Sequence, residues 1–155
     1  KAAYKQGRPI IDVAAEMTGV DVSDAMLAQA MDAKSAAGKK AYDSLIKREA
    51  TEFLREAPAA SYDIVIAGGL FDYVGDLTEL VKQIAIAMKP GGLFVFTAEM
   101  LADGQGFRFT PDRGRFYFSK SYLQELARAN GLSEVKLEET VASIGPKVWL
   151  GVFKK

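Results

Sequence analysis

Acidic residues at the ends of short apolar runs are the groups in this sequence that could do chemistry. Asp21 closes one such run and is followed at once by the helix-start signal Ser23–Asp24, while Glu49 follows the run 44–48. A charge at the tip of a buried strand is costly unless it is paired or exposed, so we expect Asp21 to face a cleft. A carboxylate has two acceptor oxygens, which match the two donors of a ribose 2′,3′-diol. The pattern indicates a nucleoside site, in which Met26 would pack on an adenine ring and Glu49 would accept its amino group.

A structural alternative stays open for both acids. Asp21 could simply cap the helix that follows it, and Glu49 could be solvated at the surface. The ligands of open α/β sheets bind at the carboxyl ends of the strands. The sequence also places Ala67–Gly68–Gly69–Leu70 and Thr97–Ala98–Glu99 at such ends.

Apolar runs and helical spacings predict the elements that must position these residues. Residues 62–67 and 93–98 are typical of strands buried on both faces. The segment 76–88 between them has helical spacing, with Asp76 and Glu79 spaced as a capping box, so the three form a βαβ unit. The other expected elements are strands at 17–21, 44–48, 134–141 and 147–153 and helices at 24–37 (closed by Gly38), 51–56 and 119–132.

This alternation predicts a single α/β domain over residues 1–155, with a doubly wound sheet and a C-terminal antiparallel hairpin. We expect Trp149 and the apolar face of 135–141 to pack on the helix 121–129. Residues 102–118 read as a long loop or small flap, with aromatic residues that face the core or a partner. Its arginines, among them Arg115, could clamp an acidic substrate or be solvated.

Composition excludes several classes of protein. The 155 residues carry 20 Lys+Arg and 20 Asp+Glu, which argues against a nucleic-acid binder. There is no Cys and no His, which excludes a thiol nucleophile, a Ser–His triad and a Cys-ligated metal, and we expect no metal site. No apolar run is long enough to span a membrane and no signal peptide is visible. We therefore expect a cytoplasmic or organelle-matrix protein that is not secreted.

Four stretches in order resemble class I S-adenosylmethionine-dependent methyltransferases. They are TGVDVSDAMLAQA, SYDIVIAGGLFDYVGDL, MKPGGLFVFTAE and GRFYFSKSYLQELARANGL. The resemblance runs from about residue 16 to residue 155. It is closest to the small-molecule-type group that includes methyltransferase-like proteins of the Williams–Beuren region and methyltransferases fused to tetratricopeptide repeats. It implies a seven-stranded sheet whose last strand is antiparallel, with S-adenosylmethionine as cofactor and a small molecule or protein as substrate.

The resemblance also assigns roles by position. Asp21 would bind the ribose hydroxyls, Val22 and Met26 would line the adenine pocket, and Glu49 and Ala50 would face the adenine amino group. Ala67, Gly68, Gly69 and Leu70 would pass beside the methionine part. Phe71 and Tyr73 would wall the substrate side, together with Arg115. The resemblance assigns no catalytic residue.

The sequence departs from the family pattern at its N-terminus and at two side chains. The family's G-x-G-x-G loop is not found. Residues 8–14 could be the strand that precedes that loop, or residues 1–15 could be the helix that follows it in a truncated chain. The family often has an acid where Gly69 stands and a His where Phe118 stands.

These departures keep other functions open. We expect the 155 residues alone to bind S-adenosylmethionine poorly or not at all, because the glycine-rich loop supplies backbone donors to the ligand. A catalytically inactive methyltransferase-like subunit of a larger assembly is the first alternative. A nicotinamide-dinucleotide enzyme is a more distant one, since an acid after the second strand also marks that fold.

Overall fold

The structure is a computed structural model that describes residues 10–35, 38–102, 104, 106–141 and 147–155. The chain divides into two compact units, Lys1–Phe53 and Leu54–Lys155, and each is described by itself. Both alternate strands with helices, so the expected α/β class is confirmed. The first unit has a parallel strand pair, and the second unit has both parallel and antiparallel pairs.

The first unit is built on a parallel strand pair. Strand β1 (Thr18–Asp21) pairs with β2 (Ser44–Lys47) in a register that places Asp21 opposite Lys47. Gly19 is needed for this contact, because a Cβ there would lie 2.7 Å from the Leu45 side chain. Helix α3 (Asp24–Asp32) connects the strands, and the Ser23 hydroxyl caps it by accepting from the Met26 N–H.

Helix α3 is shorter than predicted. Its expected end at residue 37 is wrong, because the chain turns back on itself after Asp32. The Ala41 N–H donates to the Ala33 carbonyl at 2.9 Å, and the Ser35 N–H donates to the Lys39 carbonyl at 2.8 Å. Gly38, at φ +80°, serves this turn and does not close the helix.

Residues before β1 are helical where the structure describes them. Helix α2 (Ile10–Val13) is followed by the Ala14 N–H, which donates to the Ile10 carbonyl. The strand alternative for 8–14 is therefore wrong over residues 10–13. Residues 1–9 lie outside the described part of the chain.

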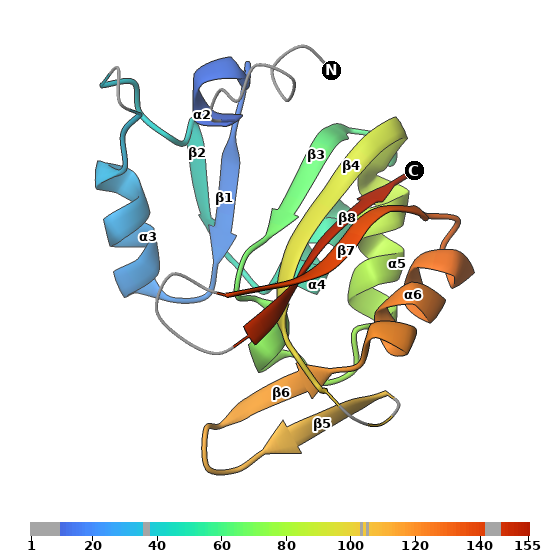
Figure 1. Cartoon of the computed structure of the whole chain (residues 1–155). Coiled ribbons are helices and arrows are strands. Elements are labelled where there is room, and N and C mark those ends of the chain that lie inside the picture. The colour runs from blue at the N-terminus through green and yellow to red at the C-terminus, as the bar shows by residue number, and fades with distance from the viewer. Residues whose placement is uncertain (1–9, 36–37, 103, 105, 142–146) are drawn as a thin grey trace. The chain divides into compact units, whose positions relative to one another are not determined.

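The second unit contains a four-stranded sheet in the order β3-β4-β8-β7 (Figure 1). Strand β3 (Tyr62–Ala67) is parallel to β4 (Met88–Glu99), whereas β8 (Lys147–Lys154) is antiparallel to both β4 and β7 (Ser133–Val141). The predicted C-terminal hairpin at one edge of the sheet is thus confirmed. The expected connection at 142–146 lies outside the described residues.

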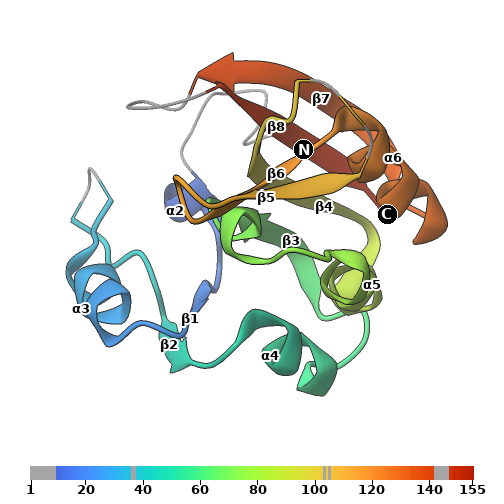
Figure 2. The same ribbon diagram turned by 90° about the horizontal axis from the view of Figure 1, so that it is seen from below.

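Helix α5 (Thr78–Ala87) contacts β4, helix α6 (Lys120–Ala129) contacts β7, and the two helices contact each other. Figure 2 shows both helices on one side of this sheet. Phenylalanines fill the space between the sheet and these helices. The buried rings are Phe71, Phe94, Phe96, Phe118 and Phe153.

Two expected details of the second unit are wrong, and the third, a long loop or small flap at 102–118, takes the form of a small flap. Asp76 and Glu79 form no capping box, because Asp76 Oδ1 accepts from the Thr78 N–H and Glu79 pairs with Gln83 and Arg55. Strand β4 begins at Met88 and not at residue 93, since Met88 still pairs with Tyr62. The expected loop at 102–118 contains a hairpin of β5 (Phe107–Thr110) and β6 (Arg115–Phe118).

The predicted packing of β7 on α6 holds at one position only. Leu137 is buried, but Val135 and Val141 are 59% and 67% exposed, so the expected apolar face of 135–141 is wrong at its two ends. The Trp149 indole N–H donates to the Phe118 carbonyl at 2.9 Å, and the Lys120 ammonium lies 5.9 Å from its ring centre. The indole N–H therefore has a backbone partner.

Two short helices complete the description. Helix α4 (Ala50–Glu56) follows β2, and a 3-10 helix, η1 (Phe71–Tyr73), follows β3. Both begin within a few residues of the carboxyl end of a parallel strand, and both carry residues that the sequence singled out.

Candidate functional site

Asp21 and Glu49 follow neighbouring parallel strands of the first unit. Asp21 is the last residue of β1, and its carbonyl accepts from the Arg48 N–H at 3.0 Å. Its carboxylate Oδ1 accepts from the Ser23 N–H at 2.8 Å. Asp21 therefore forms a turn before α3 but does not cap that helix, a role that belongs to Ser23. This arrangement fixes the carboxylate at the strand tip, as the sequence predicted.

Glu49 is tied to the start of helix α4. Its Oε1 accepts from the Thr51 N–H at 2.9 Å and from the Thr51 hydroxyl at 3.1 Å, and its Oε2 accepts from the Glu52 N–H at 2.9 Å. The alternative in which Glu49 is merely solvated is therefore wrong, because the free backbone donors of α4 bind it. Ala50 is the first residue of that helix.

Two apolar side chains near Asp21 are exposed. Val22 is 62% exposed and Met26 is 50% exposed. Both were predicted to line an adenine pocket, and their exposure leaves them available to a flat apolar ligand. Apolar surface beside a fixed carboxylate suits a molecule with one apolar end and one hydroxyl-rich end.

The glycine pair after β3 presents open backbone in the second unit. Ala67 is buried at the end of β3, and Gly69 has φ +68°. The Gly69 N–H donates to the Thr97 hydroxyl at 3.0 Å, which ties the pair to the end of β4. A Cβ on Gly68 or on Gly69 would meet nothing within 4 Å, so a ligand can approach the backbone there.

The residues after the glycines divide between core and surface. Phe71 was expected on the substrate side, but it is fully buried among Phe94, Phe96 and Phe118. Tyr73, at the other end of η1, is 65% exposed. The Arg115 guanidinium lies 4.8 Å from the centre of the Tyr73 ring. Tyr73 and Arg115 are thus brought together, as both were predicted to be on the substrate side.

Sequence reasoning missed a buried acidic pair beside Arg115. Asp72 and Glu99 are each 7% exposed. Asp72 Oδ1 accepts from the Glu99 N–H at 3.1 Å, and its Oδ2 lies 3.3 Å from an Arg115 nitrogen. Glu99 Oε2 is buried without a hydrogen-bond partner. The available signal was Glu99 itself, an acid at a strand tip like Asp21.

Burial raises the pKa of both carboxyls. Burial raises the pKa of Asp72 above its ordinary value of 3.8, and the Glu99 N–H and Arg115 oppose that change. Burial, followed by the charge of Asp72, raises the pKa of Glu99 above 4.5, against the opposing charges of Arg115 and Arg113. The cluster therefore combines a carboxyl that is paired with Arg115 and a second carboxyl, and the pKa of each is raised by burial.

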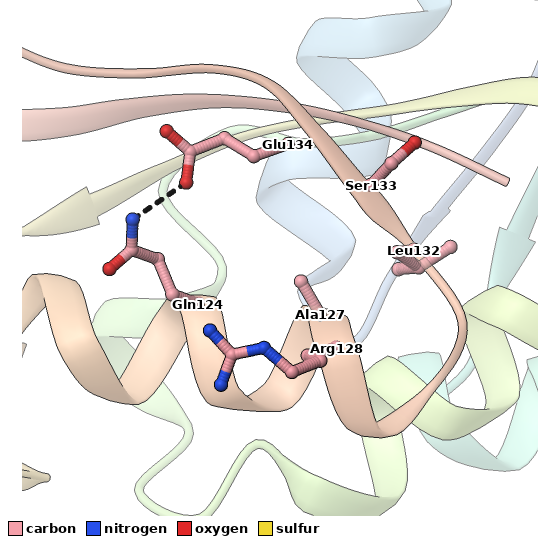
Figure 3. Close-up of a pocket in the computed structure, with 6 residues that line it drawn as sticks. All are labelled: Gln124, Ala127, Arg128, Leu132, Ser133 and Glu134. Atoms are coloured by element: carbon pink, nitrogen blue, oxygen red, sulfur yellow. Dashed lines mark hydrogen bonds between the residues drawn. The ribbon is translucent and has the colours of Figure 1, made fainter.

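A shallow hollow of about 250 Å³ lies between α6 and β7 (Figure 3). Its lining includes Gln124 and Glu134, which are joined by a hydrogen bond of 2.7 Å. Ser133, which lines it, and Leu93 of β4 both pair with Lys154, and Leu93 lies six residues before Glu99. The hollow contains none of the predicted site residues, and ligands of such sheets bind at the other ends of the strands.

Metal and membrane features are not found in the part of the chain that the structure describes. No group of three or more acidic side chains there could hold a metal ion. Among the same residues, no helix is long and apolar enough to cross a membrane.

Comparison with known proteins identifies a family that this sequence matches. A family model described as a methyltransferase domain matches residues 6–94. No curated protein matches the sequence.

Solved structures share the fold at low identity. The chain is similar to a SAM-dependent methyltransferase from Methanosarcina mazei, with TM-score 0.66 and 14% identity over 89% of this chain and 81% of that one. An S-adenosylmethionine-dependent methyltransferase from Mesorhizobium loti gives TM-score 0.67 and 19% identity, over 92% and 81%.

A third structure contains ligands. It is the 1,6-didemethyltoxoflavin-N1-methyltransferase of Burkholderia thailandensis with bound 1,6-didemethyltoxoflavin and S-adenosylhomocysteine, at TM-score 0.66 and 19% identity. The match covers 99% of this chain but 65% of that enzyme, which is less than two thirds of its length.

Proposed function

Because this chain belongs to the methyltransferase domain family, we propose that it transfers a methyl group from S-adenosylmethionine to a small molecule or to a protein side chain. The carboxylate of Asp21, fixed at the tip of β1 by the Ser23 N–H, is the observation that carries the proposal. The Burkholderia relative acts on a small heteroaromatic molecule, which supports the small-molecule choice. The four quoted stretches support the narrower Williams–Beuren-type group.

Asp21 would hold the ribose of the cofactor. Its Oδ2 has no hydrogen bond with any residue that the structure describes, and Oδ1 has lone-pair capacity beyond Ser23, so the carboxylate can accept from two hydroxyls. Val22 and Met26 would contact the adenine ring with their exposed surfaces. Glu49 and Ala50 would face the adenine amino group, since they lie where β2 ends and α4 begins.

The segment Ala67–Leu70 would lie beside the methionine part of the cofactor. The backbone fits that role, because the space beside Gly68 and Gly69 is open and the Thr97 hydroxyl holds the Gly69 N–H in place. S-adenosylmethionine supplies an activated methyl group, so the protein contributes mainly by holding the acceptor in position. Tyr73 and Arg115 would lie on the acceptor side, and Phe71 would support them from the core.

The alternative is a catalytically inactive subunit of a larger assembly. The local hydrogen bonds of Asp21 and Glu49 agree with this alternative as well, because a purely structural role would require the same bonds. Phe118, fully buried in the core, stands where the family often has a His. We also propose that the chain has a protein partner and that it is located in the cytoplasm or in an organelle matrix.

Labelled methyl transfer separates the two functions. The protein is incubated with S-adenosylmethionine labelled in its methyl group and with a small-molecule extract, and the products are separated by size. The enzyme produces labelled small molecules or labelled protein, and Asp21→Asn produces none. Binding of S-adenosylhomocysteine without labelled product would favour the inactive subunit.

A further inference from the structure

The end of β4 holds a carboxyl oxygen that the fold leaves without a partner. Glu99 is 7% exposed, and its Oε2 is buried with no hydrogen bond to any residue that the structure describes. An unsatisfied buried acceptor costs free energy that an apolar side chain of similar size would avoid. The last position of β4 therefore carries a group whose hydrogen-bonding capacity is not used by the protein itself.

The surrounding cluster holds the Glu99 backbone but leaves its carboxyl unpaired. The Glu99 N–H donates to Asp72, and Asp72 in turn binds the Arg115 guanidinium. Arg115 is stacked on the Tyr73 ring, which fixes it above η1. Arg115, whose charge acts on Glu99, is thus paired with Asp72. This chain of contacts positions Glu99 and does not satisfy its carboxyl.

Alternation along β4 places the Glu99 side chain on the same face as Thr97. Phe96 and Ala98 point to the opposite face, where Phe96 contacts Phe71 and Phe153. Thr97 receives the Gly69 N–H, and two residues of strand span about 7 Å. The Cα of Glu99 therefore lies about 7 Å along the strand from the Cα of Thr97, the residue that holds the glycine backbone proposed to lie beside the methyl donor.

We propose that Glu99 Oε2 binds the N–H or O–H group of a neutral small molecule, which is the methyl acceptor. This assignment rests on the proposed function and adds the class of acceptor, a nitrogen or oxygen nucleophile that carries a proton. Tyr73 offers an exposed ring beside the cluster for a planar acceptor. Burial and the charge of Asp72 raise the pKa of Glu99, which suits a carboxyl that takes the proton of the acceptor atom.

Imidazole and N-methylimidazole test this binding directly, because the second lacks the N–H. The protein is labelled with ¹³C at glutamate side-chain carboxyls, and the Glu99 signal is identified by its loss in Glu99→Met. At a pH where imidazole is neutral, we expect imidazole to shift the Glu99 signal in a saturable way. N-methylimidazole should bind at least about tenfold more weakly.

The variants provide the matched controls. Glu99→Met keeps the volume of the side chain but has no acceptor oxygen, so it should weaken imidazole binding about tenfold. Glu138→Gln removes a carboxylate from β7 and should leave imidazole binding unchanged. An unshifted Glu99 signal, or equal binding of both probes to the wild type, would overturn the proposal. If Glu99→Met does not fold, loss of the same glutamate carboxyl signal in Glu99→Gln identifies Glu99, and the wild-type titration then decides the point.

The same samples are titrated with S-adenosylhomocysteine. Loss of that binding with an intact imidazole response would count against the proposed methyl transfer and not against the Glu99 site. The reverse result would refute the Glu99 site and leave methyl transfer standing.

Discussion

The carboxylate of Asp72 accepts a hydrogen bond from the backbone N–H of Glu99 at 3.1 Å. This bond joins η1, which follows β3, to the last residue of β4, and Arg115 extends it to the β5–β6 hairpin. Three segments at the carboxyl end of the parallel pair are thus held by one buried side chain.

Removal of the Asp72 carboxylate should destabilise the second unit. Asp72→Ala leaves the Glu99 N–H and the Arg115 guanidinium without their partner, and we expect a loss of about 1–3 kcal/mol in the free energy of unfolding. Urea denaturation measures this loss. Asp63→Ala is the control, because its ion pair with Lys89 involves a carboxylate that is 79% exposed, and such pairs contribute about 1 kcal/mol or less. Equal losses for the two variants would contradict the role of Asp72.

The acidic pair predicts that stability falls as pH rises. The folded protein holds protons on Asp72 and Glu99 at pH values where the unfolded chain has released them, since both pKa values are raised by burial. Their contribution is complete below the ordinary values of 3.8 and 4.5 and is lost as pH rises through the raised values. Glu99→Gln cannot ionise, so its stability relative to the wild type should increase as pH rises above 4.5 and through the raised pKa of Glu99.

Urea midpoints at several pH values check this sign. If the difference in urea midpoint between the wild type and Glu99→Gln stays constant with pH, then Glu99 ionises normally in the folded protein.

Two glycine substitutions should separate folding from ligand approach. A Cβ on Gly151 would overlap the buried Phe96 ring, whereas a Cβ on Gly68 would meet no atom within 4 Å. We expect Gly151→Ala to cost about 1–3 kcal/mol or to prevent folding. Gly68→Ala should change stability by less than about 0.5 kcal/mol and should still weaken S-adenosylhomocysteine binding. Thermal unfolding and ligand titration measure the two effects, and unchanged binding by Gly68→Ala would remove Gly68 from the proposed site.

Helix α4 should depend on Glu49. Glu49→Ala removes the acceptor for the Thr51 and Glu52 N–H groups, and we expect a loss of about 1 kcal/mol in the free energy of unfolding. Glu49→Asp should recover most of it, because Asp is also a preferred residue before a helix. Far-ultraviolet circular dichroism during urea denaturation measures the loss. Equal stability of Glu49→Ala and the wild type would show that the cap contributes nothing.

Strong local patterns in the sequence were sufficient for most of the fold. The runs 62–67 and 147–153 are apolar and bounded by turn residues, and the structure confirms strands there. The β5–β6 hairpin was missed, because each strand has four residues and Arg108 and Arg115 interrupt the phenylalanines. Such short runs give too little period-two alternation to distinguish a hairpin from a loop.

Candidate site residues could be predicted only where a residue and its neighbours in the sequence form a recognisable local pattern. Asp21 could be identified from its place after an apolar run. The Asp72–Glu99 contact joins residues 27 positions apart and depends on the register of β3 and β4, which no local pattern specifies. Likewise, the capping box at Asp76 failed because Asp76 receives the Thr78 N–H and the Tyr122 hydroxyl.

Binding of S-adenosylhomocysteine to the wild type, Asp21→Asn and Asp24→Ala tests the central claim most directly. Ligand-detected NMR is suitable, because it reports the weak binding expected of these 155 residues. Asp24, which is paired with Lys47 and 80% exposed, is the matched control for loss of one negative charge. We predict saturable binding to the wild type and to Asp24→Ala, with a loss of at least about tenfold in Asp21→Asn. Wild-type protein that does not bind the ligand, or Asp21→Asn that binds it as well as the wild type, would contradict the account.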